Sequence, residues 1–264
     1  PVDVAGLVAD ASQELPVVTE PGPTPEDDDP ALVERLLSDD PAATLDTLLG
    51  ALRDGEAGPV ALAEAVVRAA THRVLRFGSV NEAADWDTVH HTLTYANAVA
   101  EAIRRQPSRE LMRAVLDAAM SVYLDRFLNI PPAPSPETFA TPDVETEQAL
   151  HRRLLGLYDR RSEVDMVAAT AHAWLRSGHS AEALFRVLAR AVLREDSGFH
   201  AFQQLDIAWR RMRRRGPTSP ATHDALTACA RWLAAHYPTV RAREQTFRIA
   251  RRLERGDRLH EVQG

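Results

Sequence analysis

The chain has 264 residues, 45% of them hydrophobic, which is enough to bury a sizeable core. Its net charge of −7 gives no general attraction to nucleic acid or acidic membranes, and no apolar run approaches the roughly 20 residues that span a bilayer. The single cysteine, Cys229, excludes an intrachain disulfide and a four-cysteine metal site, and it fits a reducing, cytoplasmic location.

The first 30 residues differ in composition from the rest. "VDVAGLVADASQEL" has the pattern of a short helix, whereas "PVVTEPGPTPEDDDP" at 16–30 combines prolines with acids and has no helical or strand period. We therefore expect an acidic, proline-rich arm over 1–30 with a short N-terminal helix, followed by one domain over 31–264.

Beyond the arm, apolar residues recur at intervals of three and four, with scarcely any alternating β-branched runs. The sequence therefore predicts an all-α fold of about ten helices. Ser108 and Ser180 are expected to cap two of them, and Gly216 with Pro217 is expected to end another. The predicted helices lie at about 31–38, 42–54, 59–77, 86–105, 108–128, 144–160, 163–177, 180–194, 198–214, 219–236 and 239–255.

A proline-rich crossover, "NIPPAPSPETFATPD" at 129–143, separates two similar halves, about 42–130 and 144–256. "LLGALRDGEAGPVALAEAVVRAA" resembles "AHAWLRSGHSAEALFRVLARAV", and the two segments that follow it match in the same order. The second pair is "DWDTVHHTLTYANAVAEAIRR" with "DSGFHAFQQLDIAWRRMRR", and the third is "SRELMRAVLDAAMSVYL" with "SPATHDALTACARWLAAHY". Each half is thus predicted to contain about four helices, related by a pseudo-twofold repeat.

Histidines occupy equivalent positions in the second pair of segments. Asp87 precedes His91 by four residues and Asp196 precedes His200 by four, so each pair shares a helix face. If the two faces meet, they form a polar pocket between helices, where imidazoles and carboxylates bind iron, manganese or zinc and two imidazoles ligate haem. The predicted cofactor-binding residues are His90, His91 and His200; the predicted metal ligands are Asp87, His91, Glu195, Asp196 and His200.

Other interpretations of these helices remain open. The Asp–His pairs have the spacing of ordinary surface ion pairs, which would have no function in binding. Alternatively, a metal-free pocket could use histidine as an acid or base. Neither pair has the Glu-x-x-His spacing of di-iron bundles. His72 and His172, on neighbouring helices, are reserve candidates for the same pocket.

Other motifs carry less weight. "RRMRRRG" at 210–216 is best explained as the basic end of a helix, so nucleic-acid binding is not expected. A glycine-rich phosphate loop, a Gly-x-Ser-x-Gly elbow and a His-Glu-x-x-His motif are absent from the sequence.

Over most of 45–260 the chain resembles an uncharacterised, all-helical actinobacterial family associated with Rieske iron–sulfur proteins. Four sequence segments carry this resemblance. They are "DWDTVHHTLTYANAV", "YLDRFLNIPPAP", "LREDSGFHAFQ" and "TVRAREQTFRIARRLERG". A Rieske centre needs two cysteines and two histidines, so with one cysteine this chain does not contain it. The resemblance implies that a Rieske-type module lies on another segment or polypeptide, and that this chain works in a redox setting.

The expected function is therefore the helical component of a redox system, an oxidoreductase if it is an enzyme, that holds iron or haem between the histidine helices. The alternative is a non-catalytic helical module that binds a small-molecule ligand or a partner without metal. The sequence does not identify a substrate or a reaction.

Overall fold

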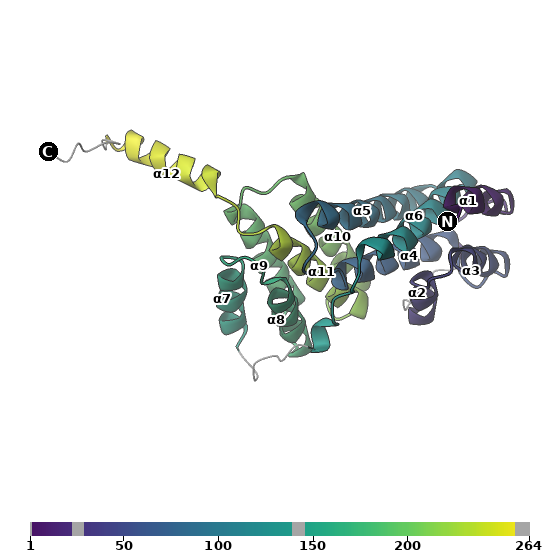
Figure 1. Ribbon diagram of the computed structural model, residues 1–264, viewed down its shortest axis with the longest axis horizontal. Coiled ribbons are helices and arrows are strands. Elements are labelled where there is room, and N and C mark those ends of the chain that lie inside the picture. The colour runs from purple at the N-terminus through teal and green to yellow at the C-terminus, as the bar shows by residue number, and fades with distance from the viewer. Residues whose placement is uncertain (1, 23–28, 139–145, 257–264) are drawn as a thin grey trace.

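The computed structural model describes residues 2–22, 29–138 and 146–256, and all regular structure within these ranges is helical. The predicted all-α fold is confirmed, although the described residues form twelve α-helices rather than about ten (Figure 1). The α-helices are α1 (Val4–Gln13), α2 (Pro30–Leu36), α3 (Pro41–Arg53), α4 (Pro59–Leu75), α5 (Ala83–Arg105), α6 (Arg109–Asp125), α7 (Glu147–Leu157), α8 (Val164–Arg176), α9 (Ala181–Arg194), α10 (Phe199–Arg215), α11 (Pro220–His236) and α12 (Ala242–Glu254), with short 3-10 helices at Arg126–Leu128 and Pro136–Thr138.

The helix boundaries follow from capping residues. The side chains of Ser108 and Ser180 accept hydrogen bonds from the backbone N–H groups of Leu111 and Ala183, at 3.2 and 3.1 Å, as predicted. Gly216 ends α10 with a φ of 81°, which a glycine adopts without a steric penalty. Local sequence thus explains where these helices start and stop.

The N-terminal segment belongs to the core rather than to a separate arm. Helix α1 packs against α3 and α6, and it buries Val8 and Ala11. Leu15 and Val18, which follow α1, are buried as well. The predicted short helix is therefore present, but the packed domain includes residues before Ala31. Residues 23–28 of the expected arm lie outside the described ranges.

Helices α4, α5 and α6 pack against one another, and α9, α10 and α11 do the same in the second half. Helix α11 also contacts α4, α5 and α8, so it joins the two groups. These contacts do not establish the predicted twofold relation: in the described residues α11 packs on α4, whereas α6 has no comparable contact with α9. Part of the predicted crossover, residues 139–145, lies outside the described ranges.

A buried ion cluster also links the halves. Glu64 on α4 is 3% exposed and forms ion pairs with Arg104 on α5 and Arg211 on α10. Burial alone would raise the pKa of Glu64, but the arginines outweigh it and lower the pKa. Because each buried charge depends on its partners, this cluster fixes the position of α10 against α4 and α5.

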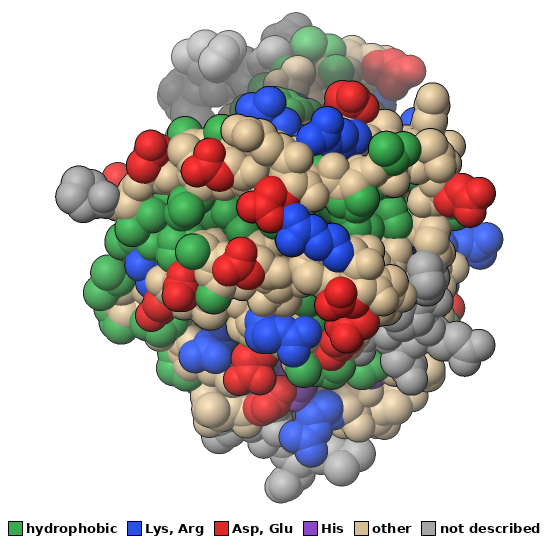
Figure 2. Space-filling model, turned by 90° about the vertical axis from the view of Figure 1, so that its right-hand side faces the viewer, with side chains coloured by type: hydrophobic (Ala, Val, Ile, Leu, Met, Phe, Trp, Pro, Cys, Tyr) green, Lys and Arg blue, Asp and Glu red, His purple; other side chains and the backbone are tan. Residues whose placement is uncertain are grey.

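The two ends of the molecule differ. Helix α12 projects from the body and has no buried residue (Figure 1). At the opposite end, around α1 to α3, acidic and basic side chains alternate with small apolar patches (Figure 2). In the parts of the chain that the structure describes, no helix is long and apolar enough to cross a membrane.

Candidate functional site

Three histidine rings meet where the first half of α5 faces the start of α10. The ring centroids of His90 and His200 lie 4.6 Å apart, those of His91 and His200 4.9 Å, and those of His90 and His91 5.9 Å. The structure therefore brings together the three residues predicted to bind a cofactor.

The cluster is graded from core to surface. His90 is fully buried, and its ring packs 5.0 Å from that of Trp232 on α11. His200 is half-buried beside the exposed ring of Phe199, and His91 is exposed. A ligand from solvent would therefore meet His91 and His200 first.

Two glutamines organise the rings. The Gln204 amide nitrogen lies 2.9 Å from Nδ1 of His90, and the Gln203 side-chain oxygen lies 3.1 Å from Nε2 of His90. The same Gln203 oxygen lies 3.0 Å from Nδ1 of His200. Because an amide oxygen only accepts and an amide nitrogen only donates, these contacts place the His90 proton on Nε2 and the His200 proton on Nδ1.

This hydrogen bonding leaves one lone pair of His200 without a hydrogen bond from a described residue. With its proton on Nδ1, His200 carries a lone pair on Nε2, and no described residue forms a hydrogen bond with that atom. A histidine whose other nitrogen donates to a carbonyl is the usual arrangement of a metal ligand or a general base. Gln203 was not among the predicted site residues; its position three residues after His200 on one helix face was the available signal.

Electrostatics keep the inner ring neutral. Burial lowers the pKa of His90 to about 4, with smaller contributions from His200 and His91, although the Gln203 hydrogen bond opposes the shift. At neutral pH His90 therefore serves as an uncharged link between Gln204 and Gln203.

The predicted carboxylate ligands have other contacts. Asp87 Oδ1 lies 3.2 Å from Nε2 of His236 on α11. Asp196 accepts hydrogen bonds from the backbone N–H groups of Ala242 and Arg243, at 2.6 and 3.0 Å, at the start of α12. These contacts replace the two expected Asp–His pairs, and Asp196 lies before α10, which begins at Phe199.

Glu195 is also engaged away from the rings. Its side chain is buried and bonds with Arg241 and Thr239 in the segment that leads into α12. The structure thus brings the histidines of the predicted metal set together without placing Asp87, Glu195 or Asp196 in contact with them.

The reserve histidines lie outside this cluster. His72 Nε2 is 3.1 Å from a carboxylate oxygen of Asp224. His172 lies on α8, and burial lowers its pKa. Neither residue contacts the histidine rings of α5 and α10.

Within the described residues, no set of three or more His, Cys, Asp or Glu side chains converges as a ready metal site. The spacing of two imidazoles satisfies one condition for a shared ion, the separation of the ring centres. An imidazole ligand places its ring centre about 3.2 Å from a metal, so two ligands at right or tetrahedral angles have ring centres about 4.5–5.2 Å apart. The 4.9 Å between His91 and His200 falls in this range.

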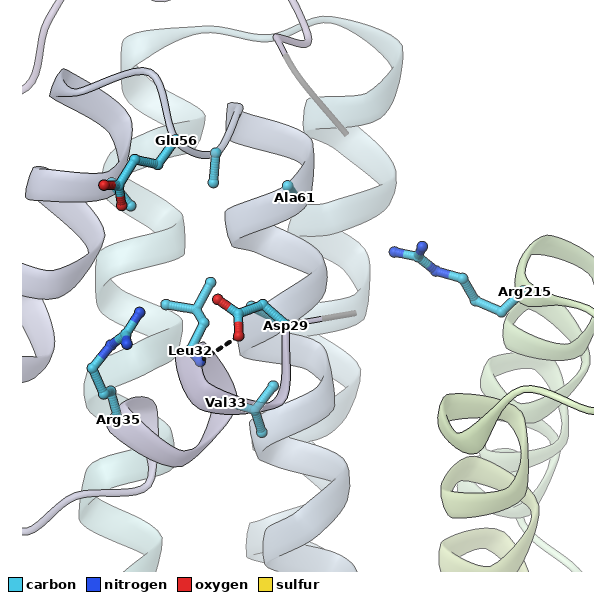
Figure 3. Close-up of a pocket in the computed structure, with 10 residues that line it drawn as sticks. Asp29, Leu32, Val33, Arg35, Glu56, Ala61 and Arg215 are labelled. Carbon is cyan, nitrogen blue, oxygen red and sulfur yellow. Dashed lines mark hydrogen bonds between the residues drawn. The ribbon is translucent and has the colours of Figure 1, made fainter. Parts of the chain in front are cut away.

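A separate pocket lies between α2, α4 and the end of α10 (Figure 3). Alanines line its interior, and Asp29, Arg35, Glu56 and Arg215 surround it. Asp29 accepts hydrogen bonds from the first N–H groups of α2, which accounts for its carboxylate (Figure 3). Arg215 and His200 stand at opposite ends of α10, about 22 Å apart along the helix axis, so this pocket is distinct from the histidine cluster.

The comparisons with known proteins found no match: no family model, curated protein or solved structure resembles the chain.

Proposed function

We propose that this chain is the helical component of a redox system and binds a transition-metal ion, iron first among the candidates, through His91 and His200. The observation that carries the proposal is the Gln203 contact, which leaves Nε2 as the unprotonated nitrogen of His200 while the His91 ring lies 4.9 Å away, centroid to centroid. Neutral imidazole nitrogens bind iron, copper, nickel and zinc.

The spacing of the rings favours a directly bound ion over a haem. Two histidines on opposite sides of a haem iron would have ring centres about 6.4 Å apart, and the porphyrin would lie between them. The ring centroids of His91 and His200 are 4.9 Å apart, which suits adjacent positions on one ion. The remaining positions on the ion would be available to solvent or substrate, and the ion would supply one-electron chemistry.

The proposed setting is cytoplasmic, with a Rieske-type iron–sulfur module on another segment or polypeptide as the electron-transfer partner. This part rests on the sequence resemblance and on the single cysteine, which rules out a Rieske ligand set in this chain. The proposed pseudo-twofold repeat would explain why both histidine helices, α5 and α10, follow equivalent segments.

A second function has an observation of its own in favour. Both ring nitrogens of His90 are held by glutamines, and the carboxylates lie elsewhere, so the cluster also suits a metal-free module that binds a polar ligand or partner. In that case His200 would accept a proton or hydrogen bond from the ligand through Nε2.

Metal content separates the two functions. The chain purified without chelator should carry stoichiometric metal by elemental analysis, and His91→Ala and His200→Ala should each abolish it while far-UV circular dichroism stays unchanged. His223→Ala, which removes a histidine bonded to the backbone of Pro217, is the matched control. Metal-free protein that also fails to take up Fe²⁺, Zn²⁺ or Cu²⁺ would reject the redox proposal and leave the ligand-binding module.

A further inference from the structure

Helix α12 and the body of the protein line an open groove in which bulky apolar side chains stand among charged ones. Leu193 at the end of α9 and Phe202 on α10 line one side, and Phe247 on α12 lines the other. Their exposed fractions are 79%, 50% and 61%, which are high for such large apolar side chains. A groove with apolar residues on facing walls suits an inserted polypeptide segment better than a flat lipid surface.

Four arginines and three carboxylates line the groove, so its lining carries a small excess of positive charge. Asp159 and Glu195 in the groove are paired with Arg194 and Arg241. Glu244 and Arg248, which also line the groove, pair with each other. Arg243 lines the groove without a direct ion pair to a described carboxylate, and its charge helps to lower the pKa of nearby Asp196.

Helix α12 adds to this charge. Arg251 stands over the Phe247 ring with its guanidinium carbon 5.8 Å from the centroid. Residues 241–255 contain six arginines and two glutamates, in a chain whose net charge is −7. The rest of the molecule is therefore acidic, and this end is basic.

We propose that the groove is a docking site for an acidic amphipathic segment of a partner protein. Bulky apolar side chains of the partner's segment would pack between Phe202 and Phe247, and carboxylates of that segment would pair with Arg243 and Arg251. The groove uses no histidine of the α5–α10 cluster, so this proposal is independent of metal binding.

The lack of tertiary packing around α12 supports an external role. The helix buries none of its own residues, so it contributes little to the core. Its orientation is set by the Glu195–Arg241 contact and by the Asp196 carboxylate at its first N–H groups. A projecting helix that is anchored at one end and exposed along its length is available for a partner to cover.

The test uses the full chain and a fluorescent amphipathic peptide of about 18 residues, or five helical turns, with Leu and Phe on one face and Glu on the other. A peptide with Gln in place of Glu and a peptide with scrambled apolar positions are the matched probes. Fluorescence anisotropy should show saturable binding of the acidic peptide, weakened by salt, and at least about tenfold weaker binding of both controls.

Variants locate the binding to the groove. Phe202→Ser with Phe247→Ser, and separately Arg243→Gln with Arg251→Gln, should each weaken binding by about tenfold. Phe127→Ser and Arg105→Gln remove an exposed aromatic and an exposed cation elsewhere and should not change it. The two arginine positions lie on α12, which buries no residue, so that variant leaves the core intact.

Three outcomes would overturn the proposal. The first is equal binding of the acidic and neutral peptides, and the second is unchanged binding by both groove variants. The third is evidence that something else occupies the groove. A second copy would be indicated by a dimer in light scattering that Phe247→Ser disrupts, and a lipid surface by binding to phosphatidylserine vesicles without binding of the peptide.

Discussion

The Gln203 side-chain oxygen lies 3.0 Å from Nδ1 of His200, and this contact determines which nitrogen of His200 carries the proton. The same oxygen is held in place by His90, which Gln204 holds from its other side. The orientation of one half-buried ring is thus set by a chain of side chains that ends in the core.

The first prediction concerns Gln203 as a positioning residue. Gln203→Ala should weaken Zn²⁺ or Cu²⁺ binding by about tenfold, since loss of the partner that orients a ligating histidine typically costs this much. Calorimetric titration measures the affinity, and the NMR shifts of the His200 nitrogens should show the loss of the single Nδ1–H tautomer. Gln245→Ala on exposed α12 is the control. Wild-type affinity in Gln203→Ala would mean that the glutamine does not support the site.

The second prediction follows from the lowered pKa of His90, about 4 in the folded chain against 6.5 ordinarily. The unfolded chain takes up a proton below pH 6.5, and the folded chain does not until about pH 4. The contribution of this residue to stability is therefore complete above pH 6.5 and decreases as the pH falls toward 4, by about 3 kcal/mol in total. Urea unfolding of wild type and His90→Gln at pH 7 and pH 4.5 should show a smaller decrease in the variant. Equal losses of stability between pH 7 and pH 4.5 in the wild type and the variant would contradict this prediction.

The third prediction concerns Asp125, which is buried at the end of α6 and accepts a hydrogen bond from Thr92 at 3.2 Å. Burial raises its pKa to about 7, above the ordinary value of 3.8, so the folded chain favours the protonated carboxyl. The stability that this preference provides is present below pH 3.8 and is lost as the pH rises through 7.

Asp125→Asn should therefore stabilise the protein at pH 8 by up to about 4 kcal/mol and have little effect at pH 4. Chemical unfolding at both pH values measures the difference. A variant that is less stable than wild type at pH 8 would show that the ionised carboxylate is required in the fold.

The fourth prediction contrasts a buried charge with an exposed one. Glu64→Gln leaves Arg211 buried without its carboxylate and should destabilise the protein by about 3–5 kcal/mol. Asp206→Asn, which removes the exposed pair with Arg210 on the surface of α10, should cost at most about 0.5 kcal/mol. Thermal and urea unfolding of both variants test the contrast; similar losses in the two would refute it.

The helices were predictable because their signals are local. Serine caps and Gly216 mark boundaries within a few residues, so the predicted and observed helices agree closely. The docking of α1 was not predictable in the same way. Val8 and Leu15 are buried by α3 and α6, and a proline-rich stretch after a helix does not reveal where that helix packs.

The histidine cluster was predictable only in part. Helical periodicity places His200 on a face, and the similar segments suggested that α5 and α10 would meet. The partners of Asp87 and Asp196 come from α11 and from the start of α12, which are distant in sequence. An i,i+4 spacing indicates that an aspartate and a histidine can reach each other on one helix. Whether they do depends on the tertiary fold, which here gives both aspartates hydrogen-bond partners on other elements.

The position of α11 determines how the molecule unfolds. This helix contacts α4, α5, α8, α9 and α10, and most of its residues are buried. Neither group of helices can open without exposing it, so both should belong to one cooperative unit in native-state hydrogen exchange. Helix α12, which buries none of its residues, can fray at its C-terminal end with little cost to that unit.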